Sequence, residues 1–138
     1  MVHTSANELR LSIMRLARQV RSQKADGDVT DGQRSVLFAL DENGEQSLGS
    51  LSDREHVTPP SMNRTVGKLV ELGLVTRVTA TDDARRVTIT ITDAGVTFVR
   101  ETRRRRDAWF SSRLATLTPE ERRIIEQAAP ILKSLSEK

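Results

Sequence analysis

The first part of the chain repeats apolar residues with the period of an α-helix, which predicts an amphipathic helix over about residues 5–25. The apolar positions of this stretch are Leu9, Ile13, Leu16, Ala17 and Val20. Residues 26–28 read Asp-Gly-Asp and should end it. Thr30 and Gln33 have the spacing of a capping box, so a second helix should begin there and end at residues 43–44, Asn-Gly.

A tight corner is encoded in the next segment. Ser47 can cap a short helix that must end near Val57, because two prolines follow at positions 59–60. Thr58 can cap the helix that starts with those prolines, and Gly73 should end it in the left-handed conformation. Its apolar stripe consists of Met62, Val66, Leu69 and Val70.

After this helix, apolar and polar residues alternate with a period of two, which is typical of β-strands. Residues 74–80 and 87–92 predict two short antiparallel strands, and the polar residues 81–86 between them predict a hydrophilic hairpin tip. Thr92 and Asp93 can cap a long helix that runs to about Leu117.

A second capping box, Thr118 with Glu121, opens the final helix, in which Pro130 should cause a kink or a weak point. The expected fold is therefore mainly α with a small β-hairpin wing (α+β), and its middle is a winged helix-turn-helix. We expect a single domain over residues 1–138, with a DNA-binding lobe at about 30–92. The flanking helices, about 5–25 and 93–138, carry apolar stripes that this chain would struggle to bury alone, which points to a homodimer.

The composition of the chain favours some classes of function and argues against others. The chain of 138 residues has 22 Lys and Arg against 19 Asp and Glu, a net charge of +3, and a pI of about 9.9, which favours a polyanionic partner. It has no cysteine, and its histidines, His3 and His56, lie far apart, so we expect no metal site and no cofactor. No nucleophile and base pair, Walker loop or dinucleotide motif is present, so the chain should not be an enzyme. Neither a secretory signal nor an apolar run of about 18 residues is present, which favours a cytoplasmic protein with no membrane partner.

The candidate recognition helix combines small, polar and basic residues opposite its apolar stripe. Arg offers a planar fork for guanine O6 and N7, and hydroxyls and amides suit base edges and phosphates of double-stranded DNA. The residues that supply these groups are Pro60, Ser61, Asn63, Arg64, Thr65 and Lys68. In the hairpin, Arg85 and Arg86 lie at the tip and Arg77 on the outgoing strand, where they can reach phosphates or a narrow minor groove.

Three motifs in register make the chain resemble the MarR family of bacterial transcriptional regulators. Residues 69–77, Leu-Val-Glu-Leu-Gly-Leu-Val-Thr-Arg, resemble the stretch that joins recognition helix to wing in that family. Asp83-Ala84-Arg85 resembles its D-x-R wing motif, and residues 91–95, Ile-Thr-Asp-Ala-Gly, resemble its L-T-x-x-G motif. Together they cover about residues 60–95. Ile91 stands where Leu is usual, and Arg86 where other residues often stand.

The resemblance implies that Pro60, Ser61 and Arg64 read base edges, that Arg85 enters the minor groove, and that Asp83 orients that arginine through a salt bridge. It also implies a repressor that binds a pseudo-palindromic operator and is released by a small aromatic or anionic effector. The sequence does not locate the effector site.

Two alternatives stay open. The winged helix could serve as an architectural DNA-binding module or as a protein-interaction module without operator specificity. The basic run Arg103 to Arg106 invites a nucleic-acid role, but four consecutive helical residues cover every side of a helix. At least one of them must therefore turn toward the interior or the partner chain, and we expect solvated or inter-subunit roles for the run.

Overall fold

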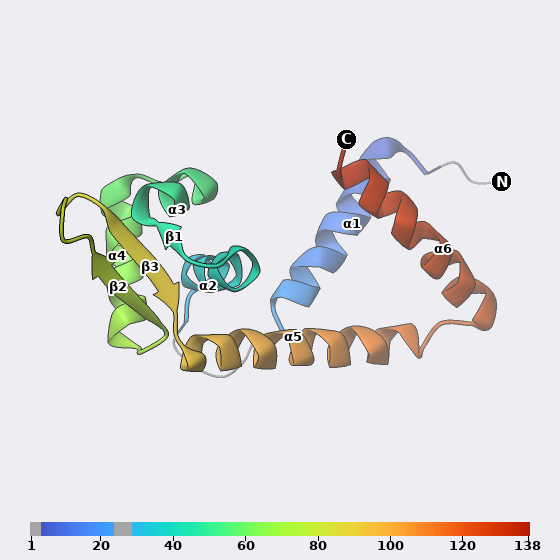
Figure 1. Cartoon of the computed structure of the whole chain (residues 1–138). Helices are drawn as coiled ribbons and strands as arrows, with labels where there is room; N and C mark the ends of the chain where they lie inside the picture. The colour runs from blue at the N-terminus through green and yellow to red at the C-terminus, as the bar shows by residue number, and fades with distance from the viewer. Residues whose placement is uncertain (1–3, 24–28) are drawn as a thin grey trace. The chain divides into compact units, whose positions relative to one another are not determined.

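The structure is a computed structural model that describes residues 4–23 and 29–138 (Figure 1). These residues form helices and a small antiparallel sheet. In chain order the elements are α1 (Ala6–Arg21), α2 (Asp31–Asn43), β1 (Gln46–Ser47), α3 (Leu48–Glu55), α4 (Pro59–Glu71), β2 (Val75–Thr79), β3 (Val87–Ile91), α5 (Asp93–Leu114) and α6 (Pro119–Ser136).

The chain divides into two compact units. One consists of Met1–Gln23 and Arg104–Lys138, and the other of Lys24–Arg103. The second unit contains α2 to α4, the sheet and the first half of α5, and therefore includes the expected DNA-binding lobe.

The expected helix starts are confirmed. Capping boxes open α1 at Ser5, α2 at Thr30 and α6 at Thr118, where each side-chain oxygen accepts a hydrogen bond from the amide three residues later. Thr58 caps α4, whose first helical residue is a proline. The left-handed conformation of Gly73, with φ 75°, follows α4 as the sequence predicts.

Two helix ends differ from the expectation. α1 ends at Arg21 because the hydroxyl of Ser22 and the side-chain amide of Gln23 both donate to the carbonyl of Gln19 and so replace the next helical turn. The expected break at 26–28 lies outside the described residues. α5 ends at Leu114, short of Leu117, since the amides of Thr116 and Leu117 bond carbonyls three residues back rather than four.

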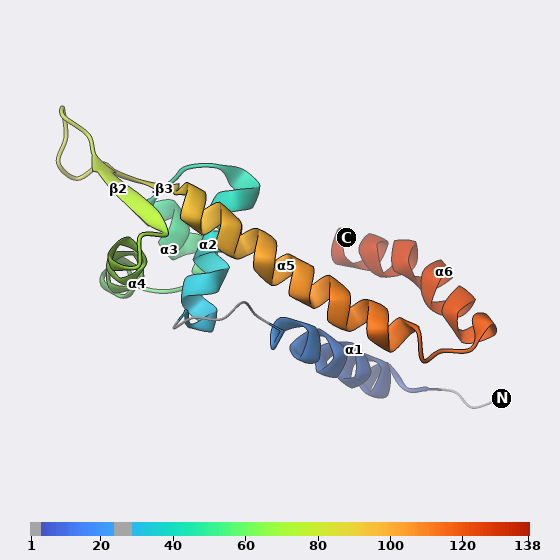
Figure 2. The same ribbon diagram turned by 90° about the horizontal axis from the view of Figure 1, so that it is seen from below.

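The sheet has three strands in the order β1-β3-β2, where the sequence predicted two. The hairpin of β2 and β3 was expected, and both views show it beside α4 (Figures 1 and 2). The additional strand β1 pairs Gln46 with Ile89 and Ser47 with Thr88. It was missed because two residues carry no periodic signal, and because Ser47 also caps α3.

The core of the second unit lies between α2, α3, α4 and the sheet. Its fully buried side chains include Val36, Leu37, Leu40, Leu51, Met62, Val66, Leu69, Val75, Ile89 and Val99. Val70, expected in the stripe of α4, is instead 40% exposed. At about 100° per residue, position 70 lies roughly 80° from Met62, at the edge of the stripe.

In the first unit, neither α1 nor α6 contains a buried residue. Large aliphatic side chains are instead exposed along both helices. α6 continues through Pro130 from Pro119 to Ser136. Among the described helices, none combines the length and the apolar composition that crossing a membrane requires.

Gly95 permits a close approach between two segments of the second unit. A Cβ at this position would collide with the carbonyl oxygen of Leu74 and lie 2.6 Å from Cγ1 of Ile91. Only glycine lets the first turn of α5 lie against the start of β2.

We therefore expect Gly95→Ala to lower the free energy of unfolding by about 1–3 kcal/mol, the usual cost of overpacking. The matched control is Gly67→Ala in α4, where an added Cβ meets nothing within 4 Å. This control should gain up to about 1 kcal/mol from helix propensity. Urea unfolding at one fixed protein concentration measures both, and a Gly95→Ala variant as stable as the wild type would contradict the close approach.

Candidate nucleic-acid interface

A helix-turn-helix is formed by α3 and α4. The hydroxyl of Ser47 accepts from the amide of Ser50 at the start of α3, and Thr58 accepts from the amide of Ser61 at the start of α4. Between them His56 adopts the left-handed conformation, with φ 55° and ψ 43°. The amide of Val57 then donates to the carbonyl of Ser52, which closes the corner. α4 packs against α2, α3 and β2, so its position is fixed from three sides.

The outward face of α4 holds most of the candidate base-reading residues. Pro60, Asn63, Arg64 and Lys68 are exposed, whereas Ser61 and Thr65 are half-buried. The hydroxyl of Thr65 donates to the carbonyl of Ser61 at 3.2 Å, so its proton is used within the helix. Thr65 can therefore still accept a hydrogen bond from an external donor but is less available to donate one.

The two cations of this face differ in their partners. The ammonium of Lys68 lies 3.6 Å from a carboxylate oxygen of Glu71. Within the described part of the chain, Arg64 has no recorded ion pair or side-chain hydrogen bond, so its guanidinium is available to a ligand.

The wing contains the predicted salt bridge. A carboxylate oxygen of Asp83 accepts from Nε of Arg85 at 3.2 Å and from the Arg85 amide at 3.0 Å. The Arg85 side chain is 91% exposed, so it is held at its base while its tip reaches into solvent. Figure 2 shows the hairpin tip extending away from the helices of its own unit.

Arg86 is neither solely a solvated residue nor an unpartnered phosphate ligand. Its guanidinium donates to both carboxylate oxygens of Asp82, at 2.9 and 3.2 Å. Its backbone carbonyl accepts from the amide of Ala80, which closes the hairpin.

Arg77 has a contact that the sequence did not reveal. One terminal nitrogen of its guanidinium donates to the backbone carbonyl of Asn63 at 3.3 Å, which ties β2 to α4. Fourteen positions separate the two residues, so no local pattern could have indicated the bond. The remaining donors of Arg77 stay available for phosphates.

A shallow groove lies between the wing and the start of α3. Ser47, Leu48 and Gly49 line one side, and Arg85, Arg86 and Thr88 are among the residues that line the other. The sequence predicted Ser47 as a helix cap but gave no sign that the pairing of β1 with β3 brings it beside the wing arginines.

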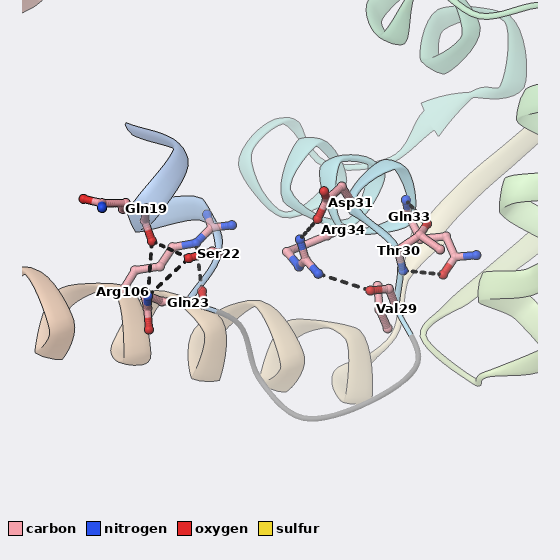
Figure 3. A network of polar contacts seen from close by, with 9 residues as sticks. All are labelled: Gln19, Ser22, Gln23, Val29, Thr30, Asp31, Gln33, Arg34 and Arg106. Atoms are coloured by element: carbon pink, nitrogen blue, oxygen red, sulfur yellow. Dashed lines mark hydrogen bonds and ion pairs between the residues drawn. The ribbon is translucent and has the colours of Figure 1, made fainter. Parts of the chain in front are cut away.

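Two residues of the basic run in α5, Arg103 and Arg106, are half-buried and bound to the protein, whereas Arg104 and Arg105 are exposed. Arg103 donates to Asp41 of α2 at 2.7 Å, lies 3.6 Å from Glu42, and stacks 5.1 Å above the ring of Phe38. In the other unit, Nε of Arg106 donates to the carbonyl of Gln23 (Figure 3). Arg103 is thus a residue of the run that turns toward the interior of its own chain, one of the two directions expected, and its contacts are neither solvated nor inter-subunit.

A buried arginine lies at the start of α2. Arg34 is 3% exposed, and its guanidinium donates to Asp31 at 2.6 Å and to the carbonyl of Val29 at 3.1 Å (Figure 3). These bonds fix the first turn of α2, beside the capping box. Of the two histidines, His3 lies outside the described residues, and the described residues contain no group of three or more potential metal ligands.

These features define a class of protein. A short helix, a tight corner, a second helix with an exposed basic face, and a hairpin with a projecting arginine make up a winged helix-turn-helix.

Comparison with known proteins identifies the family. The family model described as "MarR family" matches residues 27–86. The chain is 38% identical to an HTH-type transcriptional regulator of Mycobacterium tuberculosis over 130 residues, 94% of this chain and 91% of the relative. It is 26% identical to the HTH-type transcriptional repressor MdtR of Bacillus subtilis, over 95% of this chain and 85% of that one.

Among solved structures, the YusO protein of Bacillus subtilis aligns with a TM-score of 0.72 and 27% identity, covering 97% of this chain and 99% of that one. The chain belongs to the MarR family of helix-turn-helix transcriptional regulators. Members of this family regulate transcription and are not enzymes.

The corner itself yields a test. A residue with a Cβ is strained in the left-handed conformation, and glycine is not. We expect His56→Gly to raise the free energy of unfolding by up to about 1 kcal/mol. His56→Ala removes the same imidazole but keeps the Cβ, so it should give no such gain. Thermal unfolding of the three proteins, followed by circular dichroism, separates them; equal melting temperatures for the Gly and Ala variants would argue against strain at this corner.

Proposed function

We propose that the chain is a homodimeric repressor that binds a pseudo-palindromic operator in double-stranded DNA and works in the cytoplasm. Membership of the MarR family supports the regulatory role, and similarity to the repressor MdtR supports repression. The observation that carries the proposal is the pairing of an exposed basic face on α4 with a wing arginine that is 91% exposed and anchored by Asp83.

In this proposal α4 reads base edges in the major groove. Arg64 supplies the bidentate fork for guanine, and Pro60 and Ser61 at the start of the helix permit close approach. Asn63 and Thr65 supply additional polar groups. A single good bidentate pair contributes about 1–3 kcal/mol of discrimination, so Arg64 should dominate sequence preference.

The wing supplies affinity and shape recognition. Arg85 enters the minor groove, where a narrow A·T-rich segment concentrates negative potential. Lys68, Arg77 and Arg86 bind phosphates, and Asp83 holds Arg85 in the extended geometry that this needs. A DNA strand must compete with Asp82 for a terminal nitrogen of Arg86 and with Glu71 for the ammonium of Lys68, whereas Asp83 binds only Nε and the backbone amide of Arg85. Lys68 and Arg86 should therefore contribute less than Arg85.

A second copy of this chain should cover the apolar faces of α1 and α6. Ten large aliphatic side chains on these helices are at least 41% exposed, far more than a monomer keeps in one region. They are Leu9, Leu11, Ile13, Met14 and Leu16 on α1, and Ile124, Ile125, Ile131, Leu132 and Leu135 on α6. A two-fold dimer would then present two copies of α4 about one helical turn of DNA apart.

The small aromatic or anionic effector remains part of the proposal and rests on the family resemblance alone. Such a molecule can act only by binding more tightly to a dimer whose recognition helices are spaced wrongly for DNA. No pocket is assigned to it.

The direct test is selection of randomised duplex DNA by the purified protein at a fixed physiological salt concentration, with the mass of the bound complex determined. Enrichment of an inverted repeat bound by two chains supports the proposal. Tight binding without enrichment indicates an architectural protein instead. In that case the logarithm of the binding constant should fall with the logarithm of the salt concentration, with a slope of about −0.9 for each neutralised phosphate. Absence of DNA binding would favour the protein-interaction role.

Substitution of Arg64 tests the recognition helix. We expect Arg64→Ala to lower discrimination between the operator and a duplex changed at the contacted guanine by about 1–3 kcal/mol, or roughly 5- to 150-fold. Arg123→Ala removes the same charge from an exposed position of α6 and serves as the control. Fluorescence anisotropy on both duplexes measures the ratio, and an unchanged sequence preference would exclude Arg64 from base reading.

Substitution of Ile131 tests the dimer. This side chain is 63% exposed on α6, and Ile131→Glu would place a charge in each half of the proposed interface. Each chain would lose about 1.5 kcal/mol or more of the free energy that burial of Ile131 contributes. Since the dimer contains two copies, its dissociation constant should rise roughly 100-fold or more. Val78→Glu on β2, where the side chain is 56% exposed, is the matched control and should leave the dimer intact. Sedimentation over a concentration series measures the mass of the three proteins in solution. If the wild-type protein has the mass of a single chain, the proposed dimer is wrong.

A further inference from the structure

Four chain segments meet at one junction in the second unit. The end of α4, the start of β2, the end of β3 and the start of α5 converge there, and Thr92 lies between them. Figure 1 shows β3 leading directly into α5 beside the loop that joins α4 to β2. The junction therefore links the recognition helix to the long helix.

Thr92 makes four hydrogen bonds at this junction, and one of them is the bond that its carbonyl accepts from the amide of Val96 at 2.9 Å. Its hydroxyl donates to the carbonyl of Gly73 at 2.7 Å and accepts from the amide of Gly95 at 3.1 Å. Its own amide donates to the carbonyl of Leu74 at 3.0 Å. One side chain thus caps α5 and, at the same time, holds the residue that ends α4.

The surroundings leave little freedom for a different arrangement. Gly73 has φ 75°, which turns the chain sharply after α4, and its neighbour Leu74 lies against Gly95 with no room for a Cβ. β2 and β3 remain paired up to the junction, with Val75 opposite Ile91. A rotation of α5 about its first turn must therefore either break the bonds of Thr92 or carry the end of α4 with it.

We propose that Thr92 is a positioning residue for DNA reading, because its hydroxyl fixes the direction of α4 against the first turn of α5. The first turn of α5 and the whole of α4 belong to the same compact unit, and Thr92 lies where these two helices meet. Since two recognition helices must reach grooves about one turn apart, a small error in this direction lowers operator affinity. This inference rests on the proposed function, in which α4 reads the operator.

Positioning and stability can be separated at this residue. Thr92 is half-exposed and Gly73 is exposed, so water can satisfy the Gly73 carbonyl when the hydroxyl is removed, and the loss is then confined to the bond with the amide of the buried Gly95. Thr92→Val keeps the shape of the side chain and removes both side-chain hydrogen bonds, and it should lower the melting temperature by only a few degrees. Thr92→Ser keeps the hydroxyl and should behave as the wild type does.

Thr90→Val is the matched control. Thr90 lies on β3, two positions before Thr92, is also half-buried, and makes no side-chain hydrogen bond within the described part of the chain. The same chemical change at this position removes a hydroxyl without touching the junction.

The experiment measures affinity of the four full-length proteins for the inverted repeat recovered by selection and for a scrambled duplex of equal length. It is run well below every melting temperature, with folding verified by circular dichroism. We expect Thr92→Val to lose about tenfold in operator affinity, which corresponds to about 1.4 kcal/mol. Affinity for the scrambled duplex should not change, because non-specific binding depends on charge, which the substitution leaves unaltered. Thr92→Ser and Thr90→Val should match the wild type.

Three outcomes overturn the inference. They are an operator affinity of Thr92→Val that equals the wild-type value, an equal loss of affinity for both duplexes, and a Thr92→Ser variant that binds the operator as weakly as Thr92→Val. If the wild-type protein selects no sequence, the proposed function is wrong and the inference fails with it. Failure of the inference alone is distinguishable, because the three outcomes above require a wild-type protein that discriminates between the two duplexes.

Discussion

Burial of one face of α4 is the interaction on which the rest of the structure depends. Met62, Val66 and Leu69 are at most 2% exposed, and they pack on a core shared with α2, α3 and the sheet. Each such side chain contributes about 1.5–3 kcal/mol when fully buried, so the helix cannot rotate without losing several kcal/mol. The polar face is directed outward as a consequence, and its residues need no contacts of their own to be presented correctly.

The wing follows a different principle, since its contacts are exposed and contribute little to stability. An exposed ion pair such as Asp83 with Arg85 stabilises a fold by less than about 1 kcal/mol. Its effect is to restrict a flexible side chain that is 91% exposed, so that less conformational entropy is lost when the arginine binds. Stability and presentation are therefore supplied by separate sets of residues: apolar side chains within the lobe, and acidic partners at its edge.

Local signals in the sequence predicted most elements, whereas contacts between distant segments were not accessible. Thr30, Thr58 and Thr118 were recognisable as caps because their partners lie three residues away. The salt bridge of Asp83 followed from the family motif. By contrast, the bond of Arg77 to Asn63 and the bond of Thr92 to Gly73 span 14 and 19 positions and depend on how the hairpin packs beside α4. The strand β1 was missed for the same reason, since a pair of residues becomes a strand only when β3 lies next to it.

Net charge overstates the positive surface that DNA can use. Arg103 is paired with Asp41 and Arg86 with Asp82, while Lys68 lies near Glu71. A phosphate that binds one of these cations must displace or share an existing carboxylate, which offsets part of the gain. Arg64 has no such recorded competitor among the described residues, and it stands on a helix fixed by a buried face. An interaction with a guanine therefore replaces only hydration at Arg64, so sequence discrimination should be concentrated at this residue, while the paired cations contribute salt-dependent affinity.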